Sequence, residues 1–193
     1  LSKSFGSCAP KKINAQINQN DIQSILFTSG TEGIPKPVCL TYENFFQSSM
    51  KWKKAVKLNS QDKYLLCLPL YHIGGLAIIM RALHIGFTIN INMDIKNSFD
   101  LIGSDSIISV VPTLLKKLIN MKSHISYLKG MRCIILSGGI IPQNLLKSCI
   151  ENSLNVFISY GMTETCSGIC GRWVENNDLG DLVGTPFDGV DIT

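Results

Sequence analysis

The sequence lacks an apolar run long enough to cross a membrane, because its longest, residues 73–80, falls far short of the ~20 residues that a spanning helix needs. It also lacks a basic stripe interleaved with aromatic residues, so nucleic-acid binding is not expected despite a net charge of +4. The densest lysines, within residues 51–57, are interpreted as the solvated face of a helix. With 17% charged and 45% apolar residues, the composition is that of a globular domain rather than a disordered chain.

The seven cysteines include no Cys-x-x-Cys pair. Cys67 and Cys133 lie inside apolar runs, where a small buried thiol is the expected role. Cys166 and Cys170 have no histidine or acidic neighbours at the spacing of a zinc site. We therefore expect free thiols in a reducing compartment, either the cytoplasm or, if the gene is organellar, the plastid stroma.

The length of 193 residues suffices for one domain with a sizeable core. Residues 1–20 are polar and without periodicity, and we interpret them as a loop or a severed connection that precedes a partial domain over residues 21–193. Because the first residue is Leu1 rather than methionine, we expect the natural start to lie upstream.

From residue 22 onward, apolar segments of strand length alternate with segments of helix length. The predicted strands are residues 24–28, 64–69, 88–92, 106–111, 132–137 and 155–159. The predicted helices are residues 42–58, 75–84, 112–121 and 143–151. This alternation predicts an α/β fold with a mostly parallel sheet flanked by helices, in which ligands bind beyond the carboxyl ends of the strands.

The sharpest local signal directly follows the first predicted strand. It consists of Thr28, Ser29, Gly30, Thr31, Glu32, Gly33, Ile34, Pro35 and Lys36. Glycines allow the backbone to approach a ligand, hydroxyls and amide groups suit phosphate oxygens, and a lysine adds a point charge. The alternative is a polar turn that happens to contain two glycines. A Walker P-loop is excluded because the spacing GxxxxGK[ST] is absent.

Four further segments follow in order: LPLYHIGG at residues 68–75, SGGIIP at 137–142, SYGMTE at 159–164 and VGTP at 183–186. Together with the loop at residues 28–36 they resemble the signature motifs of the adenylate-forming superfamily, which comprises acyl-CoA synthetases, luciferases and the adenylation domains of peptide synthetases. Five matches in the same order make this resemblance highly specific.

The resemblance implies a reaction in which a carboxylate attacks the α-phosphate of ATP, and the acyl group of the resulting acyl-adenylate passes to CoA. It implies Mg²⁺ as a cofactor, held by Glu164. It also implies ATP contacts from residues 28–33 and Lys36 and from Gly138, Gly139, Ser159, Tyr160, Gly161, Met162 and Thr163. Tyr160 would pack on adenine, Gly138 and Gly139 would let the base lie against the backbone, and Thr163 would donate a hydrogen bond to the α-phosphate.

Thr163, Glu164 and His72 are the residues that the resemblance places at the reacting groups, with His72 at the border of the acyl pocket. Each has a simpler alternative when taken alone. A single histidine in an apolar loop is commonly a satisfied core residue, and Glu164 alone would be interpreted as a carboxylate at the start of a helix.

Two local features are most similar to the family of o-succinylbenzoate–CoA ligases: LYHIGGL followed by Arg81, and SVVPTLL at residues 109–115. In that family the positions of Arg81 and Ser109 lie near a dicarboxylate substrate. The alternatives for Arg81 are the solvent face of a helix or an ion pair with Asp94, because an unpaired buried charge is costly. Gly168 stands where some relatives place a polar side chain toward the substrate.

Another acyl- or aryl-CoA ligase is the nearest alternative function, and a non-catalytic nucleotide-binding remnant is the alternative of another class. Members of the superfamily continue beyond the equivalent of Thr193, through an aspartate that binds ribose and a small domain with the adenylation lysine. We therefore expect the 193-residue chain alone not to form acyl-CoA.

Overall fold

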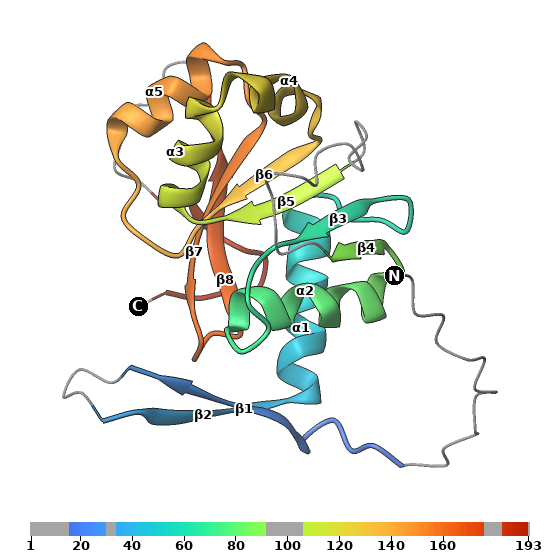
Figure 1. The fold of residues 1–193 in the computed structure, drawn as a ribbon. Coiled ribbons are helices and arrows are strands. Elements are labelled where there is room, and N and C mark those ends of the chain that lie inside the picture. Colours follow the sequence, from blue (N-terminus) through green and yellow to red (C-terminus); the bar gives the residue numbers. More distant parts are fainter. Residues whose placement is uncertain (1–15, 30–33, 92–105, 176–182, 193) are drawn as a thin grey trace, which may run out of the picture.

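A computed structural model describes residues 16–29, 34–91, 106–175 and 183–192 of the chain. Figure 1 shows a twisted sheet with helices on both faces and a separate β-hairpin below it. None of the helices in these described ranges is long and apolar enough to cross a membrane.

The central sheet has seven strands in the order β4-β3-β5-β6-β7-β8-β9. Their bounds are β3 Lys63–Leu66, β4 Thr88–Ile91, β5 Ser106–Val110, β6 Cys133–Leu136, β7 Val156–Met162, β8 Ser167–Trp173 and β9 Thr185–Pro186. The five strands from β4 to β7 are mutually parallel, whereas β8 and β9 join antiparallel. The prediction of an α/β fold with a mostly parallel sheet is therefore confirmed.

Five helices flank this sheet: α1 Tyr42–Ala55, α2 Ile73–Ile85, α3 Pro112–Asn120, α4 Lys122–Gly130 and α5 Gln143–Glu151. Helices α3, α4 and α5 pack on one face and α1 and α2 on the other (Figure 1). Successive strand residues point to opposite faces of the sheet. Ile108 therefore packs in the core under α3, α4 and α5, while Ile107 packs in the core under α1 and α2. Both faces are thus covered, which explains why β5 and β6 are buried along their whole length.

The first predicted strand lies outside this sheet. Strand β1 (Ile22–Thr28) pairs antiparallel with β2 (Lys36–Thr41) in a two-stranded hairpin. Its outward face is apolar, with Ile25 and Phe27 exposed at 52% and 67%. The strand conformation predicted for residues 24–28 is therefore confirmed, but the strand does not belong to the mostly parallel sheet. The hairpin leads directly into α1, whose first turn is closed by reciprocal hydrogen bonds between Thr41 and Asn44.

A buried ion pair connects the amino end of strand β3 to the amino end of strand β6. Asp62 precedes β3 and accepts two hydrogen bonds from the Arg132 guanidinium, at 2.8 and 2.9 Å. Arg132 precedes β6 and also donates to the Val56 carbonyl at 2.9 Å. The Asp62 side chain is almost fully buried, while that of Arg132 stays 28% exposed. The pair therefore holds β3 and β6 in register around β5.

Candidate functional site

Two cavities open at the carboxyl ends of the parallel strands. The large cavity has a volume of about 520 Å³ and is lined by Gly138, Gly139, Ile140, Ile141, Gln143, Leu146, Ile158, Ser159, Tyr160, Gly161, Arg172 and Val183. The adjoining cavity has a volume of about 370 Å³ and is lined by Leu68, Pro69, His72, Ile73, Gly74, Gly75, Val110, Val111, Ser137, Gly138, Ser159, Gly161, Met162, Ser167 and Gly168.

Three residues, Gly138, Ser159 and Gly161, line both cavities. Gly138 follows the end of β6, and Ser159 and Gly161 belong to β7, the neighbouring strand in the sheet. Two molecules bound in the two cavities would therefore meet across these residues. This is the arrangement that a reaction between two substrates requires.

At positions 138 and 161, which line both cavities, the backbone geometry requires glycine. Gly138 has φ of +79°, a left-handed conformation that residues with a Cβ rarely adopt. At Gly161 a Cβ would lie 2.1 Å from the carbonyl oxygen of Ser167 in the paired strand β8. Glycine at 161 therefore allows β8 to pack closely against β7, and glycine at 138 allows the left-handed backbone of the turn after β6.

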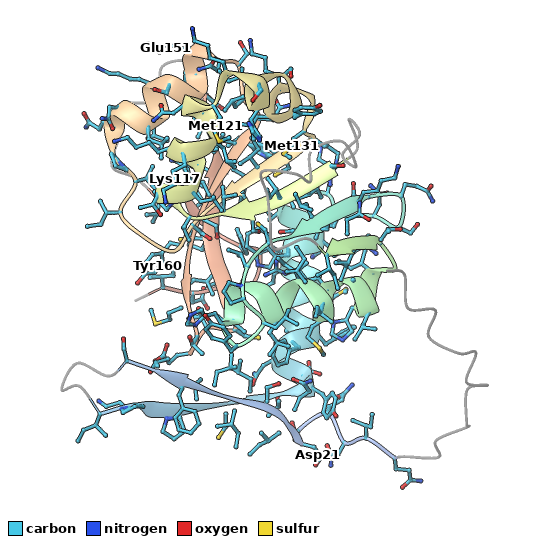
Figure 2. All side chains as sticks on the ribbon, in the orientation of Figure 1. Asp21, Lys117, Met121, Met131, Glu151 and Tyr160 are labelled. Carbon is cyan, nitrogen blue, oxygen red and sulfur yellow. The ribbon has the colours of Figure 1, made fainter. Side chains whose placement is uncertain are left out.

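The large cavity combines apolar walls with one aromatic ring. Tyr160 is 46% exposed, and Figure 2 shows its side chain projecting outward from β7. The same cavity is lined by the Gly138–Gly139 backbone and by Ile140, Ile141 and Val183. Flat apolar surfaces beside a glycine backbone turn suit a planar heterocycle.

His72 lines the adjoining cavity from the start of α2. It occupies the N-cap position of this helix, but its side chain makes no capping hydrogen bond. The centroid of the imidazole ring lies 4.5 Å from the centroid of the Tyr71 ring. The imidazole is exposed toward the cavity, so the interpretation of His72 as a satisfied core histidine is wrong.

The predicted phosphate loop lies at the tip of the β1–β2 hairpin. Thr28 donates a hydrogen bond to the carbonyl of Lys36 at 3.4 Å across the base of the loop. Thr28, Ser29 and Lys36 line neither cavity. Four other residues of this loop, Gly30, Thr31, Glu32 and Gly33, lie outside the described residues.

Thr163 and Glu164 lie in the turn between β7 and β8, directly after the cavity-lining residue Met162. Glu164 is exposed and lines a smaller hollow of about 170 Å³, together with Lys51 of α1. The described residues contain no group of three or more His, Cys, Asp or Glu side chains able to hold a metal ion by themselves. A cation at Glu164 would therefore need most of its ligands from elsewhere.

Arg81 is buried, with 3% of its surface exposed, so the solvent-face alternative is wrong. Its guanidinium donates a hydrogen bond to Ser167 Oγ at 2.6 Å, and its Cζ lies 4.4 Å from the centroid of the Trp52 ring. Burial lowers the pKa of Arg81, an effect opposed by the nearby Tyr64. Asp94, the predicted protein partner, lies outside the described residues. Arg81 does not line the adjoining cavity, but its partner Ser167 does.

Ser109 is also buried, and it lies behind the cavity wall. Its Oγ is 2.6 Å from the hydroxyl of Tyr64, and it lines neither cavity. Burial raises the pKa of Tyr64 to about 12, while the Arg81 charge opposes this rise. Tyr64 is therefore a neutral hydrogen-bonding group that lies between Ser109 and the cation.

Sequence analysis missed several lining residues, namely Gln143, Ser167 and Arg172. Ser167 and Arg172 belong to β8, which was not predicted as a strand. The available signal was the position of Ser167 three residues after Glu164, since a strand that returns antiparallel from the YGMTE segment brings that residue back to the cavity. Gln143 begins α5 just after the SGGIIP turn.

Comparison with known proteins adds an independent line of evidence. The profile of the family described as "AMP-binding enzyme" matches residues 2–193. A 2-succinylbenzoate–CoA ligase of Bacillus cereus (strain Q1) is 35% identical over 162 residues, which cover 82% of this chain and 34% of that protein. The Bacillus mycoides (strain KBAB4) protein of the same name is 34% identical over 169 residues, covering 86% and 35%. The chain thus spans about a third of the length of these curated relatives.

Solved structures of enzymes of the same kind are similar to this chain. The o-succinylbenzoate CoA synthetase of Bacillus subtilis in complex with ATP and magnesium ion superposes with a TM-score of 0.80 at 32% identity, covering 92% of this chain and 38% of that one. The same enzyme in complex with the acyl-adenylate intermediate OSB-AMP superposes with a TM-score of 0.79 at 32% identity, covering 89% and 36%.

Proposed function

The chain belongs to the AMP-binding enzyme family, and on that premise we propose that the protein containing it activates a carboxylic acid with ATP and passes the acyl group to CoA. The observation that supports this most is the pair of cavities that share Gly138, Ser159 and Gly161. One cavity would hold the adenine nucleotide and the other the acid. In the first step a carboxylate oxygen bonds to the α-phosphorus and pyrophosphate leaves. In the second the CoA thiol displaces AMP.

Residues of the large cavity would bind the nucleotide. Tyr160 offers its ring to the adenine, and the Gly138–Gly139 backbone offers a surface without side chains. We assign contacts with the phosphates to Thr163 and to the hairpin tip with Thr28, Ser29 and Lys36, whose hydroxyls and charge suit phosphate oxygens. A polyphosphate is long enough to reach beyond the cavity that holds its base.

The chemistry of the described donors fits Mg²⁺ bound jointly with ATP. Magnesium prefers oxygen ligands, keeps several waters, and is usually held by one or two carboxylates plus substrate phosphates. Glu164 supplies one exposed carboxylate beside the Thr163 hydroxyl. The ion would neutralise phosphate charge, while Glu164 and Thr163 fix its place relative to β7.

The adjoining cavity suits an acid with an apolar body and a second negative group. Its walls include Leu68, Ile73, Val110 and Val111, and Arg81 lies buried behind Ser167. We therefore propose o-succinylbenzoate, an aromatic dicarboxylate, as the substrate, in line with the names of the relatives. His72 would contact the acid from the start of α2, and Ser109 would act from behind the wall through Tyr64.

Replacement of Arg81 by leucine should reduce kcat/KM for o-succinylbenzoate about 10- to 100-fold, because a hydrogen-bonding contact with a charged group contributes roughly 1.5–3 kcal/mol. For the analogue that keeps the reacting carboxylate but lacks the second one, the loss should be small. Acyl-CoA formation by the complete gene product, measured for the two acids, checks this. Equal losses for both acids would show that Arg81 acts only as a structural residue.

Replacement of Tyr160 by leucine should raise the KM for ATP about tenfold, because stacking of a base on an aromatic side chain contributes roughly 1–3 kcal/mol. The KM for the acid should change little, since Tyr160 lines only the large cavity. Tyr127→Leu on α4 is the matched control, because Tyr127 lines neither cavity. An unchanged KM for ATP in Tyr160→Leu would remove Tyr160 from the nucleotide site.

The proposed function as a whole is tested by mass spectrometry of the products. The complete gene product, incubated with ATP, Mg²⁺, CoA and o-succinylbenzoate, should form o-succinylbenzoyl-CoA, AMP and pyrophosphate. If a thioester forms only with another acid, the proposed reaction is correct but o-succinylbenzoate is not the substrate. Nucleotide binding without any thioester would identify a non-catalytic protein.

We also propose a reducing compartment, the cytoplasm or the plastid stroma. This is supported by the six described cysteines, which are all free thiols. Burial raises the pKa of Cys133 and Cys149 to about 12, which keeps these two thiols protonated and unreactive.

A further inference from the structure

The Trp52 indole is part of the core behind the adjoining cavity. Trp52 is 2% exposed and packs edge-on against Phe157 and Phe187, with ring centroids 6.0 and 5.3 Å away. The guanidinium of Arg81 lies over the same indole, 4.4 Å from its centroid. Trp52 therefore connects the aromatic core to a buried cation.

Few polar groups hold the buried Arg81 guanidinium. It donates a hydrogen bond to Ser167 and also interacts with the Tyr64 hydroxyl, whereas its buried Nε has no partner among the described residues. No described carboxylate lies within ion-pair distance of it. A desolvated guanidinium over an indole gains a substantial cation–π attraction, stronger for tryptophan than for phenylalanine. The guanidinium is thus held beside the cavity by the Trp52 ring together with Ser167 and Tyr64.

The indole can occupy this place only because residue 168 has no side chain. A Cβ on Gly168 would lie 2.6 Å from Cζ2 of Trp52 and 2.4 Å from Oγ of Ser159. Both distances are far below normal contact, so either the indole or Ser159 would have to move. Gly168 and Ser159 line the adjoining cavity, which makes Trp52 the layer directly behind its wall.

We propose that Trp52 is a positioning residue that holds the Arg81 guanidinium against Ser167, and that Gly168 is needed to admit its indole. The proposal rests on the proposed function, since the oriented cation would select acids with a second carboxylate. Trp52 itself would not touch the acid. It would act by setting where the positive charge lies behind the cavity wall.

The test compares two changes that disturb the same contact from opposite sides. Trp52→Phe keeps an aromatic ring in the core but weakens the attraction for Arg81, and Gly168→Ala pushes the indole away. For each variant of the complete gene product, kcat/KM is measured for o-succinylbenzoate and for the analogue that lacks only the second carboxylate. We expect the preference for the dicarboxylate to fall about tenfold in Gly168→Ala and severalfold in Trp52→Phe. The KM for ATP should stay unchanged in Trp52→Phe, because Trp52 lines neither cavity.

Trp173→Phe is the matched control, because Trp173 also packs edge-on against Phe157 but is 41% exposed and does not contact Arg81. Dissociation constants for the same acids, measured by calorimetry without turnover, separate the two hypotheses. If the wild-type protein binds the dicarboxylate more tightly than the analogue but forms no acyl-adenylate, only the proposed function fails. If both variants keep the wild-type preference among the acids, Trp52 has no positioning role.

Discussion

Replacement of Glu164 by alanine is expected to slow acyl-adenylate formation by ~10²-fold or more, because it removes the one protein carboxylate assigned to Mg²⁺ beside the reacting phosphate. The side chain is exposed in the turn between β7 and β8, so its loss should leave the fold intact. The rate is measured as pyrophosphate exchange into ATP in the presence of acid. The KM for the acid should change much less than kcat.

The matched control is Glu151→Ala at the end of α5, an exposed glutamate that lines neither cavity. It should retain wild-type exchange. Raising the Mg²⁺ concentration should restore part of the activity of Glu164→Ala, since a weakened metal site is filled by mass action. Near-wild-type exchange in Glu164→Ala at ordinary Mg²⁺ concentrations would contradict the assignment of Glu164 to the metal.

Replacement of Asp62 by alanine should lower the free energy of unfolding by about 3 kcal/mol, because it leaves the Arg132 guanidinium without its buried partner. This is the low end of the usual range for a broken buried pair, since Arg132 stays 28% exposed and keeps some of its hydration. The Asn59 amide also loses its acceptor on Asp62. Urea denaturation, read as the shift of the midpoint, measures the loss.

The double variant Asp62→Ala/Arg132→Ala should lose less than the sum of the two single variants, because it contains no unpaired charge. Asp188→Ala serves as a control on the surface. Both side chains of the ion pair between Asp188 and Lys54 are exposed, so its loss should not change the free energy of unfolding measurably. Additive losses in the double variant would show that Asp62 and Arg132 stabilise the fold independently.

The parallel part of the sheet could be predicted from sequence because burial on both faces makes its strands continuous apolar runs. Residues 106–111 and 132–137 correspond to β5 and β6. Strand β8 was missed because its sequence, SGICGRW, contains two glycines and a charge and therefore resembles a loop. In the structure a Cβ at Gly171 would lie 2.5 Å from the ring of Phe157, so tight packing requires the glycine.

Helix α4 and strands β2 and β9 were also missed. Strand β2 includes Pro37 and is half exposed, so it lacks the buried apolar run that marks the central strands. Helix α4 follows α3 after the single residue Met121, and its mixed composition hides the boundary between them.

The candidate site could be predicted where its residues are neighbours in one motif. Gly138, Gly139, Tyr160 and Gly161 line the large cavity, and His72 lines the adjoining one. The surroundings of Arg81 could not be predicted, because α2 is apolar on nearly every side and shows no polar face that would orient the side chain. Its partner Ser167 is 86 residues away in the sequence, and its contact with Trp52 depends on how α1 and α2 pack.

The central claim, that the two adjoining cavities bring a carboxylic acid and ATP together, is tested most directly by acid-dependent exchange of pyrophosphate into ATP. The complete gene product should catalyse this exchange with Mg²⁺ and o-succinylbenzoate in the absence of CoA, because the acyl-adenylate forms before CoA reacts. Exchange should be slower with the monocarboxylate analogue that keeps the reacting carboxylate. If no carboxylic acid supports exchange although ATP binds, the cavities do not form an adenylation site and the account is wrong.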